Sequence, residues 1–206
     1  MSARQTPRRA KTARLADLEL VEPRDRADWH AWLVANHATS QGVWLAVGKK
    51  GNAVTALTYE DAVEEAVCFG WIDSTVHRLD AHRFKQLFTP RQPGSAWSRS
   101  NKLRLERLEA AGLMTGAGLA AVEAAKADGS WTALDDVENL IVPADLTAAL
   151  DADPAVSRHF ASFTDSARKM ILFWITSAKR PETRAKRIAE TVGEAAKGRL
   201  PRQIAP

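Results

Sequence analysis

The pattern of hydrophobic and polar positions predicts an α+β fold with a small, mainly antiparallel sheet and flanking helices, followed by a helical C-terminal half. Residues 15–23 and 42–50 show the short apolar pattern of strands, whereas residues 25–37 carry apolar positions at helical spacing. Thr58 followed by Asp61 resembles a capping box. We therefore expect a second helix to begin there, before a pair of strands.

The chain after the loop TPRQPGSAWS is predicted to be helical throughout. Apolar residues recur there at helical spacing in six segments, which are 98–111, 117–129, 143–153, 153–163, 164–179 and 181–198. Strands and helices are segregated rather than alternating, which argues against a doubly wound parallel sheet. We divide the chain into a disordered basic tail at 1–14, an α+β region at 15–112 and a helical region at 113–206.

The stretch CFGWIDSTVHRLDAHRFKQLFTPRQ, residues 68–92, alternates in the manner of a β-hairpin over 70–90. Successive strand side chains point to opposite faces, so each strand divides into two sets. The apolar set is Ile72, Val76, Phe84 and Phe88. The other set is Trp71, Asp73, His77, Arg83, Lys85, Thr89 and Arg91. A slip of one residue in the register would exchange the two faces of one strand.

This second face is interpreted as a ligand-binding surface, and its alternative is the solvated side of a half-exposed sheet. Arginine binds carboxylate or phosphate through two parallel hydrogen bonds, and tryptophan offers a stacking face. In this hypothesis Arg91 holds an anion and Asp73 fixes the arginine, while two tryptophans wall the pocket. The candidate residues are Trp71, Asp73, Arg78, Arg91, Trp97 and Lys102.

Charge is segregated along the 206 residues, although the net charge is only +4. Residues 1–14 carry five positive charges and no negative one, and residues 179–206 carry eight positive and three negative charges. A nucleic-acid-binding protein using this tail and the C-terminal basic helix is therefore an alternative hypothesis. Its weakness is that base reading calls for a recognisable nucleic-acid-binding fold.

Catalytic and cofactor motifs are weaker than the hairpin pattern. Cys68 served by His77 and Asp73 would form a nucleophilic arrangement, but a cysteine at the apolar end of a helix is more often a small buried hydrophobe. Residues 116–121 match G-x-G-x-x-A, yet a helical segment precedes them where a dinucleotide site needs a strand. We expect no cofactor and no metal, and a binding protein rather than an enzyme. An enzyme using His77 or Asp73 as acid or base remains the further alternative.

The composition also bears on the compartment. No apolar run approaches the roughly 20 residues that span a bilayer, so no transmembrane segment is expected. The basic N-terminal segment is not followed by an apolar core with a cleavage site, as a secretory signal would require. A single cysteine fits a reducing compartment. The expected location is the cytoplasm.

Several phrases together resemble the bacteriocin-protection, YdeI/OmpD-associated family of bacterial proteins. They are AWLVANHATSQGVWL, TYEDAVEEAVCFGWID, RFKQLFTPRQPGSAWSRSN, GLAAVEAAKADGSW and FWITSAKRPETRAKRI, and they extend the resemblance from Leu18 to Arg199. The resemblance implies a role in stress resistance, that is, in tolerance of bacteriocins or antimicrobial peptides. It also implies a protein partner such as a porin, and it brings no catalytic set. The expected function is a non-enzymatic protein that binds a small anionic ligand or a protein partner.

Overall fold

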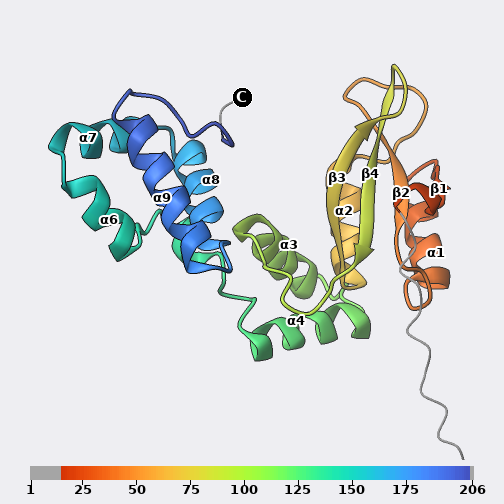
Figure 1. The fold of residues 1–206 in the computed structure, drawn as a ribbon. Helices are drawn as coiled ribbons and strands as arrows, with labels where there is room; N and C mark the ends of the chain where they lie inside the picture. The colour runs from red at the N-terminus through yellow and green to blue at the C-terminus, as the bar shows by residue number, and fades with distance from the viewer. Residues whose placement is uncertain (1–14, 205–206) are drawn as a thin grey trace, which may run out of the picture. The chain divides into compact units, whose positions relative to one another are not determined.

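The computed structural model describes residues 15–204, and the tail expected at 1–14 lies outside these described residues. The described chain forms two compact units. The first extends to Ser95 and includes Ser100–Asp128, and the second consists of Ala96–Arg99 together with the chain from Gly129 onward (Figure 1). Residues 113–128, which follow the boundary expected at 112, are part of the first unit.

A four-stranded sheet in the order β1-β2-β4-β3 organises the first unit. The strands are β1 (Leu20–Val21), β2 (Val43–Gly48), β3 (Trp71–Arg78) and β4 (Arg83–Pro90). β1 pairs with β2 in parallel, and the other two pairings are antiparallel. The predicted α+β class with a mainly antiparallel sheet is therefore confirmed.

The first predicted strand is much shorter than its apolar pattern indicates. Residues Leu15–Asp17 form a 3-10 helix, and Leu20 and Val21 alone pair with β2. The backbone carbonyl of Leu15 accepts a 2.9 Å hydrogen bond from Nε1 of Trp44, a residue of β2. This tertiary contact holds the segment before β1 in a turn. Strand pairing would instead require that segment to be extended.

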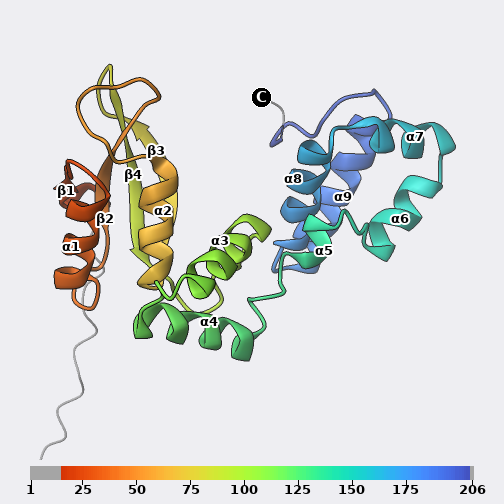
Figure 2. The ribbon, with the colours of Figure 1, turned by 180° about the vertical axis from the view of Figure 1, so that it is seen from behind.

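Two helices of the first unit lie against the sheet. They are α1 (Arg26–Asn36) and α2 (Tyr59–Cys68), and the latter covers β3 and β4 (Figures 1 and 2). The predicted capping box is present, since Thr58 and Asp61 exchange side-chain and backbone hydrogen bonds at the start of α2. The buried indole of Trp29 donates a 3.1 Å hydrogen bond to the Ala62 carbonyl and lies 5.7 Å from the ring of Phe88. These contacts fix α1 and α2 on the face of the sheet that carries Phe88.

Helix α4 (Gly116–Asp128), which follows α3 (Arg99–Ala110), packs closely against the end of α2. A Cβ atom on Gly118 would lie 2.3 Å from the Cys68 carbonyl oxygen, so only glycine allows this approach. The G-x-G-x-x-A segment therefore opens α4 after another helix, and its second glycine serves helix packing.

The second unit is helical and has its own hydrophobic core. Its helices are α5 (Asp135–Glu138), α6 (Ala144–Asp151), α7 (Pro154–Ser162), α8 (Asp165–Thr176) and α9 (Pro181–Ala195). Leu146, Ile171 and Ile175 are completely buried at its centre, with Phe160 beside them. Predicted segments 143–153 to 181–198 thus correspond to α6–α9, with ends that differ by a few residues.

Candidate functional site

A β-bulge changes the faces of the predicted hairpin. The pairing of β3 with β4 shifts between Asp73 and Val76, so Asp73 lies opposite Phe88 while His77 lies opposite Lys85. The expectation that Asp73 and Trp71 share a face with Lys85 and Thr89 is therefore wrong, and the one-residue slip applies to the first half of β3. The physical reason is that one extra residue in the bulged strand reverses the alternation beyond it.

Asp73 consequently faces helix α2 and joins a polar network there. Its Oδ2 accepts hydrogen bonds from the Tyr59 hydroxyl at 2.9 Å and from Nε2 of Gln86 at 3.2 Å. Nε2 of Gln86 also donates to the Ser74 carbonyl at 2.9 Å. The buried amide of Gln86 and the first turn of α2 thus hold the carboxylate in one position.

The phenol of Tyr59 is a hydrogen-bond donor in this network. Burial, together with the hydrogen bond to Asp73 and its negative charge, raises the pKa of Tyr59 to about 12. Ionisation would place a phenolate against a carboxylate, which explains the direction of the shift. At neutral pH Tyr59 is therefore protonated, and its hydroxyl donates to Asp73.

Arg91 directly follows β4. Its backbone N–H donates a 3.0 Å hydrogen bond to the carbonyl of Gly70, a glycine with a φ of 72°. Burial lowers the pKa of Arg91 to about 10, and the attraction of Asp73 opposes that change. The fixing of Arg91 by Asp73 and the binding of a ligand by this pair remain predictions.

Helix α3 adds a second arginine that the sequence did not single out. Arg104 forms a bidentate ion pair with Glu60 through Nε at 2.9 Å and Nη2 at 2.7 Å. Its Nη1 donates to Oδ1 of Asn101 at 3.0 Å. The sequence signal that could have identified the polar network around Asp73 is Tyr59. It is the sole tyrosine of the chain and directly follows the capping residue Thr58.

The other predicted site residues lie in different surroundings. Trp71 is 1% exposed, donates a hydrogen bond to the His37 carbonyl at 3.3 Å and meets the ring of Trp32 edge-on. Trp97 belongs to the second unit, where it is buried with its ring 5.3 Å from that of Trp131. Both indoles are interior residues, so neither presents an open ring face as the predicted pocket wall requires.

The two remaining cations of the predicted set lie at other positions of the first unit. Arg78 is exposed at the last position of β3, opposite Phe84. Lys102 is half-buried on α3. Their assignment to a ligand site remains a prediction.

The cysteine-based catalytic hypothesis is not supported by these positions. Burial raises the pKa of Cys68 to about 11, so its thiol is protonated at neutral pH. His77 lies on the face opposite Asp73, with its ring 5.1 Å from that of Trp44. Among the described residues no group of three or more His, Cys, Asp or Glu side chains could hold a metal ion.

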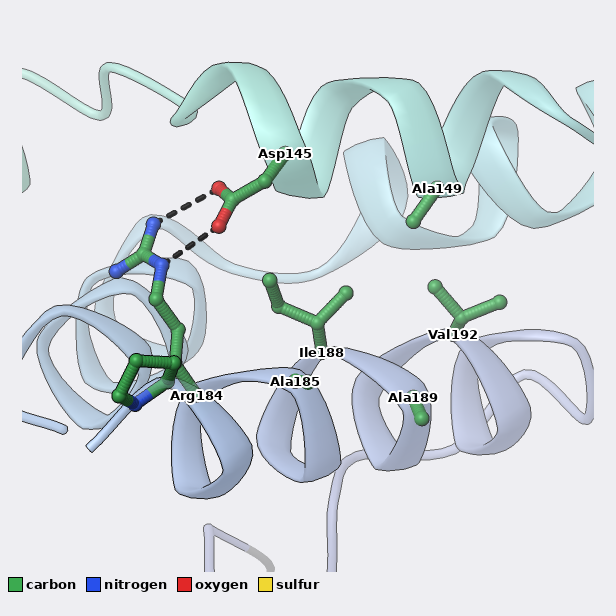
Figure 3. Close-up of a pocket in the computed structure, with 8 residues that line it drawn as sticks. Asp145, Ala149, Arg184, Ala185, Ile188, Ala189 and Val192 are labelled. Carbon is green, nitrogen blue, oxygen red and sulfur yellow. Dashed lines mark hydrogen bonds and ion pairs between the residues drawn. The ribbon is translucent and has the colours of Figure 1, made fainter.

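The second unit contains a groove between α6 and α9 with a volume of about 470 Å³ (Figure 3). Its lining residues are Asp145, Ala149, Pro181, Arg184, Ala185, Ile188, Ala189 and Val192. Most of this lining is apolar, and the two ionisable residues lie together at one end. Of the lining residues on α9, Ala185 and Ala189 are exposed, whereas Ile188 and Val192 are half-buried.

The charged end of this groove is an ion pair between the two helices. Arg184 donates from Nε to Oδ2 of Asp145 at 2.6 Å and from Nη2 to Oδ1 at 2.8 Å. The hydrogen-bonded guanidinium lowers the pKa of Asp145, and the carboxylate raises that of Arg184. Figure 3 shows α6 and α9 running in the same direction from this end, with Val192 at the other end.

Some basic side chains of α9 make contacts within the second unit. Besides Arg184, the guanidinium of Arg187 lies 5.3 Å from the ring centroid of Trp174 and donates to its backbone carbonyl. Lys186 is exposed. Two of the three cations at positions 184–187 of this basic helix therefore have contacts within the unit.

Two family models match the chain, and the gap between them, residues 122–138, contains the start of the second unit's main segment at Gly129. Residues 21–121 match a model described as Domain of unknown function (DUF8412). Residues 139–198 match one described as Bacteriocin-protection, YdeI or OmpD-Associated. Searches of curated proteins and of solved structures gave no match.

The matched residues also refine the predicted resemblance. It is confirmed for the helical unit, whereas residues 21–121 match a different model, so the expected extent from Leu18 to Arg199 is reduced. Within the described chain no helix is long and apolar enough to cross a membrane. Residues 139–198, which include α6–α9 and the groove between α6 and α9, are the part of the chain that matches the bacteriocin-protection, YdeI or OmpD-associated family.

Proposed function

We propose that this protein is a non-enzymatic binding protein of bacteriocin or antimicrobial-peptide tolerance, and that the groove between α6 and α9 receives its ligand or partner segment. One observation carries the proposal: the groove lies within the residues that match the bacteriocin-protection family. Its volume of about 470 Å³ is in the range typical of ligand pockets. A cytoplasmic location is part of the proposal, and the single buried thiol of Cys68 is compatible with it.

The composition of the groove favours binding over catalysis. Ala185 and Ala189 are exposed, and their small side chains leave room above the half-buried Ile188 and Val192. Asp145 and Arg184 are the ionisable members of the lining, and each has the other as its hydrogen-bond partner. An apolar surface with one charged end provides affinity through burial and orientation through charge.

Anilinonaphthalene sulfonate, a dye that fluoresces in apolar sites, tests whether the groove binds. The native protein should bind it, and Ala189→Phe should abolish the signal by filling the groove. Ala148→Phe is the matched control, because Ala148 is exposed on α6 and does not line the groove. Absence of dye binding to the native protein, or equal binding to both variants, would refute the proposed site.

Tolerance is tested in cells that depend on this protein. Cells with the wild-type chain or with Ala148→Phe should survive a cationic antimicrobial peptide better than cells with Ala189→Phe. Equal survival at equal protein levels would show that tolerance does not require the groove.

A small-anion site in the first unit is a second candidate function. It is favoured by the attraction between Asp73 and the partly buried Arg91, with Arg104 held nearby by Glu60. Thermal unfolding in the presence of phosphate and of citrate tests it. Stabilisation that Arg91→Ala and Asp73→Asn both remove supports the site, and stabilisation unchanged in both variants contradicts it.

Nucleic-acid binding through the basic tail at 1–14 and the C-terminal basic helix remains an alternative. It predicts a gel shift at low salt that weakens steeply as salt rises. The contacts of Arg184 and Arg187 within the second unit leave fewer cations of α9 for phosphate. No shift at low salt would remove this alternative.

A further inference from the structure

We propose that the groove between α6 and α9 takes a single-chain anionic amphiphile, a fatty acid, with its carboxylate at Arg184 and its alkyl chain along Ile188 and Val192. This inference rests on the proposed function, since it names the ligand class of the same groove. It specifies an anionic head group and one unbranched tail for the ligand proposed above.

The groove changes from charged to apolar along one face of α9. Arg184, Ile188 and Val192 are spaced four residues apart, so they lie on one face of the helix. Eight residues of α-helix correspond to about 12 Å along the axis. Figure 3 shows this order, with the ion pair at one end and Val192 at the other. The arrangement matches a molecule that has one charged end and one apolar tail.

Two helix N-termini meet at the charged end. Asp145 is the second residue of α6 and Arg184 is the fourth residue of α9, and these two side chains are joined by their ion pair. Within the described chain the N-cap residues Pro143 and Arg180 make no side-chain capping hydrogen bond, and Oδ1 of Asp145 accepts one from the Leu146 N–H at 2.9 Å in the first turn of α6. The two helix dipoles contribute a positive potential at this end, which favours an anion, and the first-turn carboxylates of Asp145 and Glu182 offset part of it. The polarity of both helices therefore adds to the charge of Arg184.

Arg184 has donor capacity beyond its present contacts. Its guanidinium carries five N–H donors. Within the described residues two are used on Asp145 and one on the Ile175 carbonyl at 3.4 Å, which leaves two. The side chain of Asp145 is 46% exposed, so it can return to water if a ligand carboxylate replaces it. A carboxylate head can thus share the guanidinium or take the place of Asp145.

The alternative occupants fit these features less well. A cationic amphiphile would bring its charge to Arg184 and to two helix N-termini, where the potential is unfavourable. A helix of a protein partner would be about 10 Å wide with its side chains, and only about two turns would lie along the groove. A single alkyl chain needs neither a wider opening nor a longer one.

Dye displacement with three amphiphiles of equal tail length tests the inference: dodecanoate, dodecanol and dodecyltrimethylammonium, each below its micelle concentration. Dodecanoate should displace anilinonaphthalene sulfonate from the native protein at a concentration at least tenfold lower than the other two. Arg184→Gln should remove this difference, and Arg184→Lys should keep part of it. Shorter carboxylates should bind more weakly, by at most about fourfold for each methylene that loses its burial.

The outcomes separate this inference from the proposed function. Equal displacement by dodecanol and dodecanoate refutes the anionic head group and leaves the groove as a binding site. Displacement by an uncharged apolar peptide but not by dodecanoate also refutes it and indicates a protein segment. Failure of the dye to bind refutes the proposed function itself. Asp145→Asn, which keeps Arg184, serves as the second variant and should bind dodecanoate at least as tightly as the wild type.

Discussion

The hydroxyl of Tyr59 donates a 2.9 Å hydrogen bond to Oδ2 of Asp73, which joins the first turn of α2 to strand β3. Gln86 on β4 binds the same carboxylate oxygen, so three elements meet at one atom. The bulge in β3 makes this possible, because it turns Asp73 toward the helix.

Ultraviolet titration of phenolate absorbance should report this bond directly, since Tyr59 is the one tyrosine in the sequence. We expect a pKa of about 12 in the folded protein, and Asp73→Asn should lower it part of the way toward the ordinary 10.0, because burial is the larger cause. A native pKa at the ordinary value would contradict the hydrogen-bonded arrangement.

The same shift predicts a loss of stability at high pH. The unfolded tyrosine ionises near 10.0 and the folded one near 12, so the stabilisation is fully present below the first value and is lost as pH rises through the second. Tyr59 is 40% exposed, so solvent screening limits the effect to about 1 kcal/mol. Denaturation of the wild type and of Tyr59→Phe across this range should show the smaller loss in the variant.

Asp73 and Arg91 should be coupled in a double-mutant cycle. Asp73→Asn leaves Arg91 buried without this counter-charge, so we expect a loss of about 1–2 kcal/mol in the free energy of unfolding. The loss should be smaller when Arg91→Met is already present, because methionine fills space without carrying charge. Chemical denaturation of the four proteins gives the coupling, and strictly additive changes would show that the two groups do not interact.

Two glycines of α4 should respond in opposite ways to alanine. Gly118→Ala places a methyl group 2.3 Å from the Cys68 carbonyl oxygen, so the first unit should lose about 1–3 kcal/mol of stability. Gly116→Ala meets nothing within 4 Å and should be neutral or slightly stabilising, because alanine favours helix. Equal melting temperatures for the two variants would contradict the close contact of α4 with α2.

Cys68 should be unreactive in the folded protein. Its thiol is 2% exposed, and burial raises its pKa to about 11, so little thiolate forms near neutral pH. Iodoacetamide labelling followed by mass spectrometry should be slow in native buffer and fast in denaturant. Rapid labelling of the native protein would restore the hypothesis of a cysteine nucleophile.

The predicted elements show what local pattern can determine. The capping box at Thr58 and the apolar spacing in the C-terminal half gave helices at the expected positions, because capping and amphipathic spacing act within a few residues. The predicted length of the first strand was wrong, because the contact of Leu15 with Trp44 is a tertiary contact that no local pattern contains. The alternation of the hairpin located both strands but could not reveal the bulge after Asp73.

The sequence by itself determined the α+β class, the succession of helices and strands, and the resemblance that the match over residues 139–198 confirms. Tertiary structure alone decided which side chains meet. One extra residue in β3 placed Asp73 beside Tyr59 rather than beside Lys85. Packing of α6 on α9 placed Asp145 beside Arg184, 39 residues away, and left a groove between the two helices. Spacing along a chain fixes the faces of one element, whereas a site between elements depends on register and packing, which no local pattern contains.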